Sequence, residues 1–232
     1  MSTLLEQRQK NRADDIFFPA MALLILVIVV TGFAQSYFLA GMVRAKLPNT
    51  LVHIHGALFV SWIFLLLIQT TLVSVRKLRW HIALGVMGII LPPLMLIFGT
   101  LTLFDSIRRA QLGIPPEILL VGDLEQLILF VVLIAWAMIA RRNAASHKRL
   151  MILGTMAILG PAIDRWHFGL PVTIGVSLAL PLLIVGYDLC LLRRVHRSTA
   201  IGYAMVATMI LTLLPVSSLP VWQHCIHWIR HT

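Results

Sequence analysis

Histidines are the residues of this chain whose type and spacing best suit chemistry. A neutral imidazole can bind a metal or a haem iron through one ring nitrogen. His53 and His55 stand two residues apart in LVHIHGALFVSWIFLLLIQT, a run that is otherwise almost entirely apolar. His81 and His147 each open another apolar run, and each is followed seven residues later by a glycine. This short repeat predicts that histidine and glycine share one helix face.

The elements that position these histidines are predicted to be membrane helices. Of the 232 residues, 59% are hydrophobic and only 12% are charged, against about 25% charged in an average soluble domain. We therefore expect an all-α, polytopic transmembrane helix bundle. Apolar runs near the required length of about 20 residues predict seven spans. These spans are 17–40, 51–75, 81–104, 118–140, 149–167, 170–192 and 200–222.

The distribution of charge predicts the orientation of the bundle. If the N-terminus is cytoplasmic, thirteen of the 19 lysines and arginines lie on the cytoplasmic side, and the other six, including Arg44 and Lys46, lie outside. This asymmetry predicts one membrane domain over 1–232, with a cytoplasmic segment at 1–16, the bundle at 17–222 and an outer tail at 223–232. It indicates an inner membrane and anionic lipid headgroups as partners, and it excludes nucleic acid as the reason for the net charge of +10.

Helical phase distinguishes the two histidines of the second span. Residues two apart on a helix point about 200° away from each other, so His53 and His55 do not face the same neighbour. Trp62 and Gln69 follow His55 at seven and fourteen residues and share its face. A glutamine in hydrocarbon needs a protein partner, so this face is predicted to be interior. His53 shares its face with Gly56, where a small residue permits close approach of another helix.

The predicted depths place two pairs of histidines where a b-type haem could bind. Such a haem takes one imidazole from each of two facing helices. The inner pair is His81 and His147, with Arg79, Arg149 or Lys148 near the propionates. The outer pair is His55 and His167, with Arg165 beside it. Two haems would carry electrons across the membrane, with a quinone or a redox partner protein as partner.

Other interpretations stay open at this point. A metal-dependent membrane enzyme would use His53, His55, His224 and His227 to bind zinc, copper or iron. A small transporter would line its route with polar residues such as Gln69, Ser177 and Asp188, whereas an accessory subunit would use them to hold helices together. Asp188 lies five residues before Arg193, which predicts an ion pair between them near the membrane surface.

Four short motifs carry a resemblance to other proteins. The strings H-x-H-G, Q-T, H-x-x-L-G and H-K-R-L-M, in this order, resemble those of a group of uncharacterised bacterial multi-pass membrane proteins over about residues 17–199. More distantly, the two histidine-led helix starts are similar to those of cytochrome b561-like and haem A synthase-like proteins. The distant resemblance implies haem b. In b561-type proteins the ligands lie more clearly inside the spans than His81 and His147 do.

Overall fold

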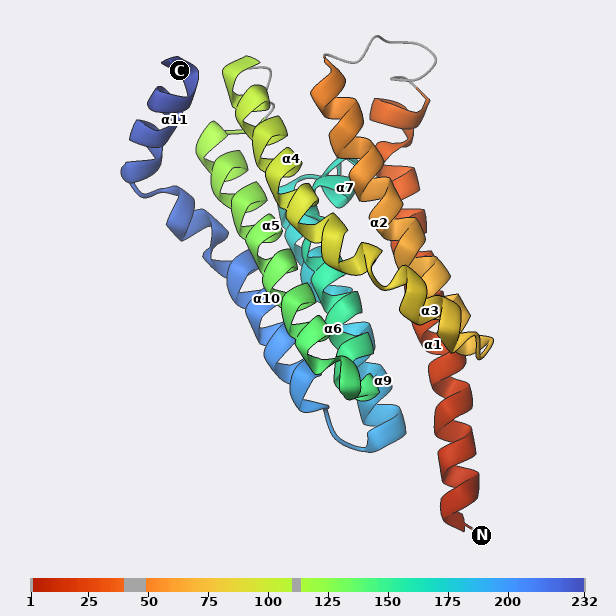
Figure 1. Ribbon diagram of the computed structural model, residues 1–232. Coiled ribbons are helices and arrows are strands. Elements are labelled where there is room, and N and C mark those ends of the chain that lie inside the picture. The colour runs from red at the N-terminus through yellow and green to blue at the C-terminus, as the bar shows by residue number, and fades with distance from the viewer. Residues whose placement is uncertain (1, 40–48, 110–113, 232) are drawn as a thin grey trace.

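The computed structural model describes residues 2–39, 49–109 and 114–231. Arg44 and Lys46, which we assigned to the outer side, lie outside the described residues. The described residues form helices and no strands, which confirms the predicted all-α bundle (Figure 1). In chain order the helices are α1 (Ser2–Phe33), η1 (Ala34–Phe38), α2 (Thr50–Ser74), α3 (Leu78–Leu84), α4 (Met87–Arg109), α5 (Pro116–Ile139), η2 (Ala140–Arg142), α6 (Ala144–Ala157), α7 (Gly160–Asp164), α8 (Leu170–Ala179), α9 (Leu182–Leu192), α10 (Arg197–Ser217) and α11 (Val221–His231).

Six helical segments of the described chain are long and apolar enough to cross a membrane. They correspond to six of the seven predicted spans, and they are Arg12–Phe33, Thr50–Ser74, Leu78–Arg109, Pro116–Arg142, Leu170–Leu192 and Arg197–Ser217. Large apolar side chains such as Ile82, Ile97 and Leu211 are exposed on the outside of these segments. Exposing this apolar surface to water would be unfavourable in free energy, whereas contact with lipid is not. The protein is a multi-pass membrane protein.

The seventh predicted span, 149–167, is broken in the structure. α6 ends at Ala157 and α7 begins at Gly160, because Pro161 lacks the backbone N–H that would continue the helix and its ring clashes with the preceding turn. The 14 residues of α6 cover about 21 Å, which is less than the roughly 30 Å of a hydrocarbon core. The prediction of one continuous span was therefore wrong, because α6 and the short α7 are two separate helices (Figure 1).

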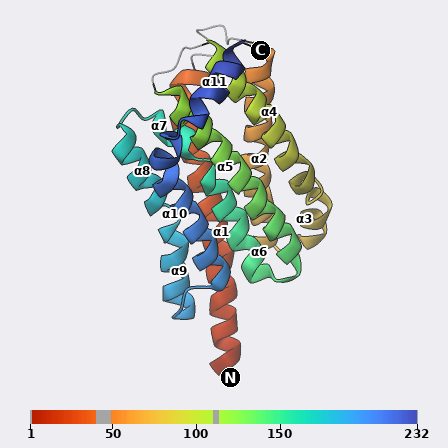
Figure 2. The same cartoon turned by 90° about the vertical axis from the view of Figure 1, so that its left-hand side faces the viewer.

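α6 lies in the centre of the bundle. It packs against α5 and α10, with further contact to α1, and the views in Figures 1 and 2 agree on this position. Leu150, Ile152 and Leu153 of α6 are fully buried, as are Phe130 and Leu133 of α5. We call the end of the bundle where α1 begins the inner end, and the opposite end the outer end.

The predicted outer tail lies mostly in a helix, α11. α11 buries Ile226 and Ile229 against a small apolar cluster on α4 and α5. Arg108 at the end of α4 donates from Nε to the carbonyl oxygen of Ile229 at 2.9 Å. The exposed face of α11 carries His224 and His227. α11 therefore covers the outer end of α4 and α5.

Gly32 of α1 packs closely against α7, so a larger residue at this position is expected to destabilise the protein. A Cβ atom built on Gly32 of α1 would lie 2.8 Å from the carbonyl carbon of Ala162 in α7, closer than atoms pack. Gly32→Ala is therefore expected to push α1 and α7 apart and to lower the free energy of unfolding by about 1–3 kcal/mol. Thermal unfolding in detergent measures this. Gly175→Ala is the control, because a Cβ there meets no described atom within 4 Å; equal losses for both variants would contradict the contact.

Candidate functional site

The structure brings His81 and His147 together at the inner end of the bundle. His81 lies on α3 and His147 lies in the first turn of α6. Their ring centres are 6.4 Å apart and the ring planes are nearly perpendicular, at 85°. Both side chains are half-buried. We call these two residues the inner histidine pair.

His147 is held in a defined orientation. Asn143 caps α6 by accepting a hydrogen bond from the backbone N–H of Ser146 at 3.1 Å, so the helix start is fixed. The Nδ1 atom of His147 lies 2.8 Å from the carbonyl oxygen of Ala137 on α5. A carbonyl oxygen only accepts, so Nδ1 carries a proton, and in the neutral form of the ring Nε2 is the nitrogen with the lone pair. Ligand histidines are commonly oriented in this way.

His81 lies beside the glutamine that we expected in the interior. Nε2 of Gln69 donates to the backbone carbonyl oxygen of His81 at 3.1 Å, which provides the protein partner that Gln69 needs. Oε1 of Gln69 and Nδ1 of His81 are both buried without a hydrogen-bond partner in the described part of the chain. Buried polar atoms without a partner are uncommon in proteins, and they suit a place where a polar guest or water binds.

The two helices that carry the inner histidine pair pack against other helices. α3 packs mainly against α2, whereas α6 packs against α5 and α10. A Cβ built on Gly88, seven residues after His81, would meet no described atom within 4 Å although Gly88 is buried. A Cβ on Gly154, seven residues after His147, would lie 2.9 Å from a side-chain atom of Ile134. Of the two repeated glycines, only Gly88 leaves space for a ligand.

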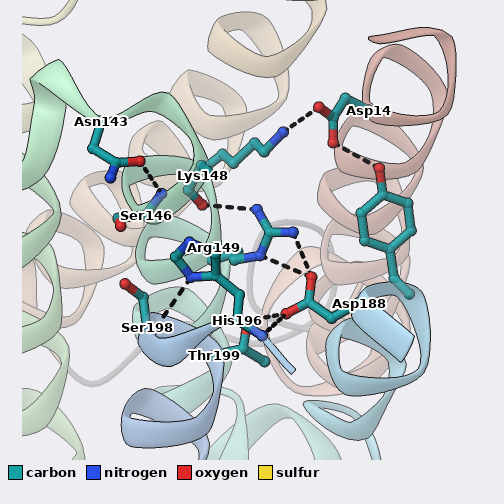
Figure 3. Close-up of polar contacts among 11 residues, drawn as sticks. Asp14, Asn143, Ser146, Lys148, Arg149, Asp188, His196, Ser198 and Thr199 are labelled. Atoms are coloured by element: carbon teal, nitrogen blue, oxygen red, sulfur yellow. Dashed lines mark hydrogen bonds and ion pairs between the residues drawn. The ribbon is translucent and has the colours of Figure 1, made fainter. Parts of the chain in front are cut away.

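Arg149 does not point to this space, because it forms a buried ion pair with Asp188 of α9 (Figure 3). Its Nε donates to Oδ1 of Asp188 at 2.9 Å, and its Nη1 donates to the carbonyl oxygen of Ala145 at 2.8 Å. Only 1% of the Arg149 side chain and none of the Asp188 side chain is exposed. Two expectations were therefore wrong: Asp188 pairs with Arg149 rather than Arg193, and Arg149 is not available to a propionate.

Asp188 is fully hydrogen-bonded by its neighbours. Its Oδ2 accepts from the hydroxyl of Thr199 at 2.6 Å and from the backbone N–H of His196 at 3.0 Å. We call Arg149, Asp188, Thr199 and the His196 backbone the Asp188 network. It ties α6, α9 and α10 together, and sequence reasoning missed its ion pair because Arg149 and Asp188 are 39 residues apart along the chain.

Lys148 is also engaged, at the boundary between α1 and α6. Its ammonium forms an ion pair with Asp14, whose other oxygen accepts from the hydroxyl of Tyr187 at 2.6 Å. Figure 3 shows Lys148 and Asp14 beside the Asp188 network. Arg79 is exposed at the start of α3. Of the cations expected near an inner propionate, Arg79 is the one that these contacts leave accessible.

The predicted outer pair is not joined by a ring contact among the described residues. The ring of His55 lies 4.3 Å from that of Phe59, and within the described chain its Nδ1 is buried without a hydrogen-bond partner. His167 is exposed and lines a hollow with Arg165 at the outer end. The structure thus places Arg165 beside His167, as expected, but among the residues it describes it gives no contact between His167 and His55.

The expected phase of α2 agrees with the structure. Trp62 is buried and donates from Nε1 to the hydroxyl of Thr155 on α6 at 3.1 Å. His53 is exposed, and its ring centre lies 6.2 Å from that of Tyr37. A Cβ on Gly56 would lie 2.9 Å from the Tyr37 ring, which is the close approach predicted for that face.

The alternative metal ligands lie apart from one another along the fold. His53 and His55 begin α2, whereas His224 and His227 lie on α11. The ring of His227 lies 4.3 Å from that of His231, and the Nδ1 atom of His224 lies 3.3 Å from the carbonyl oxygen of Pro220. Within the described residues, no group of three or more His, Cys, Asp and Glu side chains is arranged to hold a metal ion.

No known family model, curated protein or solved structure matches this chain. The class of the protein therefore rests on its own fold and side chains. It is a multi-pass membrane protein with two histidines from separate helices facing each other at the inner end.

Proposed function

We propose that this protein is a membrane redox protein that binds one b-type haem between His81 and His147. The observation that carries the proposal is the distance of 6.4 Å between the two ring centres. A metal–imidazole bond is about 2 Å long, and the ring centre lies about 1 Å beyond the nitrogen, so two imidazoles that held one metal between them would have ring centres about 6 Å apart. The inner histidine pair has this separation.

The hydrogen bond of His147 supports the same role. Its Nδ1–H donates to the carbonyl oxygen of Ala137, so in the neutral imidazole Nε2 is the nitrogen that would bind iron. Haem iron takes neutral imidazole ligands, and a hydrogen bond on the other ring nitrogen raises the basicity of the ligand. Bound haem b supplies reversible one-electron exchange, and the chain's own residues orient the ligands and limit access of water.

The surroundings of the inner histidine pair suit a flat apolar group with one charged edge. A Cβ on Gly88, seven residues after His81 and in α4, would meet no described atom within 4 Å, and the exposed side chains of Trp80 and Ile82 place α3 against lipid. Arg79 is exposed at the start of the same helix, but it lies two residues before His81 and about 200° round α3 from it, so only its long, flexible side chain would bring its charge to a propionate at the membrane surface. Because Lys148 and Arg149 have other partners, Arg79 remains of the three cations that we named as alternatives for this role.

A single haem at the inner histidine pair implies that electrons are exchanged at only one membrane surface. No contact joins His55 to His167 among the described residues, so the proposal includes no second haem and no electron path across the bilayer. With the orientation that the charges predict, the centre faces the cytoplasmic side of an inner membrane. Its electron partner is then a quinol in the bilayer or a redox protein at that surface.

Absorption spectroscopy of the purified protein in detergent tests the proposal. We expect a Soret band, sharpened α-bands on reduction with dithionite, and about one haem per chain. His81→Ala and His147→Ala are each expected to lose the haem. His224→Ala is the matched control, because His224 is exposed on α11, and it is expected to keep the full spectrum.

Three results would overturn the proposal. Haem that survives both alanine substitutions would mean that other ligands hold it. A colourless protein with stoichiometric zinc, copper or iron would point to a metal-dependent enzyme. A colourless protein without metal would leave a small transporter or an accessory subunit, with Gln69 and Asp188 serving only transport or helix packing.

A further inference from the structure

The outer end of the bundle has a hollow that the proposed haem centre does not use. Its volume is about 570 Å³. One wall is the end of α1 with η1, where Thr31, Gly32 and Ala34 line it, and the other is the segment after α7, residues 165–168. We call it the outer hollow.

The outer hollow lies at the boundary between hydrocarbon and headgroups. The first membrane-crossing segment ends at Phe33 and the fifth begins at Leu170, so the ends of two membrane-crossing segments meet here. Val30, Phe168 and Leu170 next to it are 45%, 68% and 37% exposed. These apolar side chains suit contact with acyl chains, whereas a soluble ligand would leave them in water.

Arg165 supplies a positive charge in this hollow. Its guanidinium lies 4.3 Å from the ring centre of Phe33, and Nη1 donates to the carbonyl oxygen of Pro161 at 2.6 Å. No carboxylate forms an ion pair with Arg165 in the part of the chain that the structure describes, although Asp123 and Asp164 interact with it electrostatically. A guanidinium has five N–H donors, so Arg165 retains donors for an anion.

The backbone beside Arg165 is held in an unusual conformation. His167 has φ of 60° and Gly169 has φ of 88°, in the left-handed region that side chains other than glycine rarely adopt. Nε1 of Trp166 donates to the hydroxyl of Thr31 at 3.3 Å, which ties the segment to α1. Left-handed residues that the surrounding structure maintains are frequent at ligand sites.

We infer that the outer hollow binds the phosphate headgroup of an anionic phospholipid. Arg165 binds the phosphate, the aromatic side chains of Trp166 and Phe168 lie at headgroup depth, and the acyl chains run along the apolar surface of α1 and α8. Arginine suits this role because its planar N–H groups match phosphate oxygens. The inference is independent of the haem proposal, since it uses other residues at the other end of the bundle.

Native mass spectrometry of the full chain measures this binding directly. Titration with phosphatidylglycerol is expected to give a higher affinity than titration with phosphatidylcholine. A cation near a lipid surface contributes about 1 kcal/mol, so Arg165→Gln is expected to weaken phosphatidylglycerol binding about fivefold. Arg230→Gln is the matched control, because Arg230 is an exposed outer cation away from the hollow. Asp164→Asn removes a nearby negative charge and is expected to strengthen binding.

The competing outcomes are distinct. Equal affinity for both lipids, or no effect of Arg165→Gln, would overturn the inference and leave only general contact with the bilayer. Displacement of phosphatidylglycerol by millimolar inorganic phosphate would mean that the hollow takes a soluble anion instead. If Arg165→Gln unfolds at the same temperature as the unsubstituted protein, its fold is intact. If it unfolds at a lower temperature, the affinity of Asp164→Asn for phosphatidylglycerol tests the effect of charge instead, and an affinity that does not rise would overturn the inference.

Discussion

Asp188→Ala is expected to lower the free energy of unfolding by about 3–5 kcal/mol. The substitution leaves the guanidinium of Arg149, which is 1% exposed, without its counter-ion inside the bundle. It also removes the acceptor for the hydroxyl of Thr199 and for the backbone N–H of His196. Arg149 would keep its hydrogen bond to the carbonyl oxygen of Ala145, but one neutral acceptor does not offset the free-energy cost of removing a charge from water. Unfolding by heat or by SDS titration in mixed micelles measures the loss.

Two further variants separate charge from hydrogen bonding at this position. Asp188→Asn keeps an oxygen that can accept from Thr199 or His196 but removes the negative charge. The difference in the free energy of unfolding between Asp188→Asn and Asp188→Ala therefore isolates the contribution of the hydrogen bonds. Replacing both partners, as Arg149→Met with Asp188→Leu, removes the unpaired charge and is expected to recover much of the stability lost in Asp188→Ala. A double variant less stable than Asp188→Ala would contradict this explanation.

The Asp188 network also bears on the inner histidine pair. Arg149 lies two residues after His147 in α6, and the network binds this part of α6 to α9 and α10. Lys148 binds the same turn to α1 through Asp14. Contacts on three sides therefore fix the helix start from which His147 projects. The His147 ring needs this support, because its own hydrogen bond to Ala137 fixes only its orientation.

Features set by short stretches of sequence could be predicted. The face of α2 that carries His55, Trp62 and Gln69 follows from helical period alone, and Trp62 and Gln69 do contact the interior. The shared depth of His81 and His147 followed from the ends of the apolar runs, and their rings do lie together. Both predictions needed only the helix geometry and the membrane boundary.

Features that depend on packing between distant segments could not be predicted in the same way. Along the chain, the arginine nearest to Asp188 is Arg193. In the folded bundle, however, Asp188 is buried beside Arg149 and pairs with it. His55 and His167 lie at similar predicted depth, but depth does not specify the angle around the bundle. The break before Pro161 turns the segment after α7 towards the end of α1, where Trp166 contacts Thr31.

Trp62→Ala is the second substitution with a large expected effect. Trp62 is 1% exposed and is among the largest fully buried side chains, and its ring meets Phe130 edge to face with centres 5.0 Å apart. Truncating a buried tryptophan leaves a cavity between α2, α5 and α6, and it removes the donor to Thr155. Truncations of this kind lower the free energy of unfolding by about 3–5 kcal/mol. Trp80→Ala is the control, because Trp80 is 64% exposed and faces lipid.

The same variant separates the redox and transport hypotheses. Trp62 lies seven residues from both His55 and Gln69, about 10 Å from each along α2, so its ring occupies the interior between these two polar side chains. A haem held by His81 and His147 does not need Trp62, so Trp62→Ala is expected to keep its Soret band in the fraction that folds. If the protein holds no haem, and liposomes that contain the Trp62→Ala variant leak solute, Trp62 instead closes a transport route.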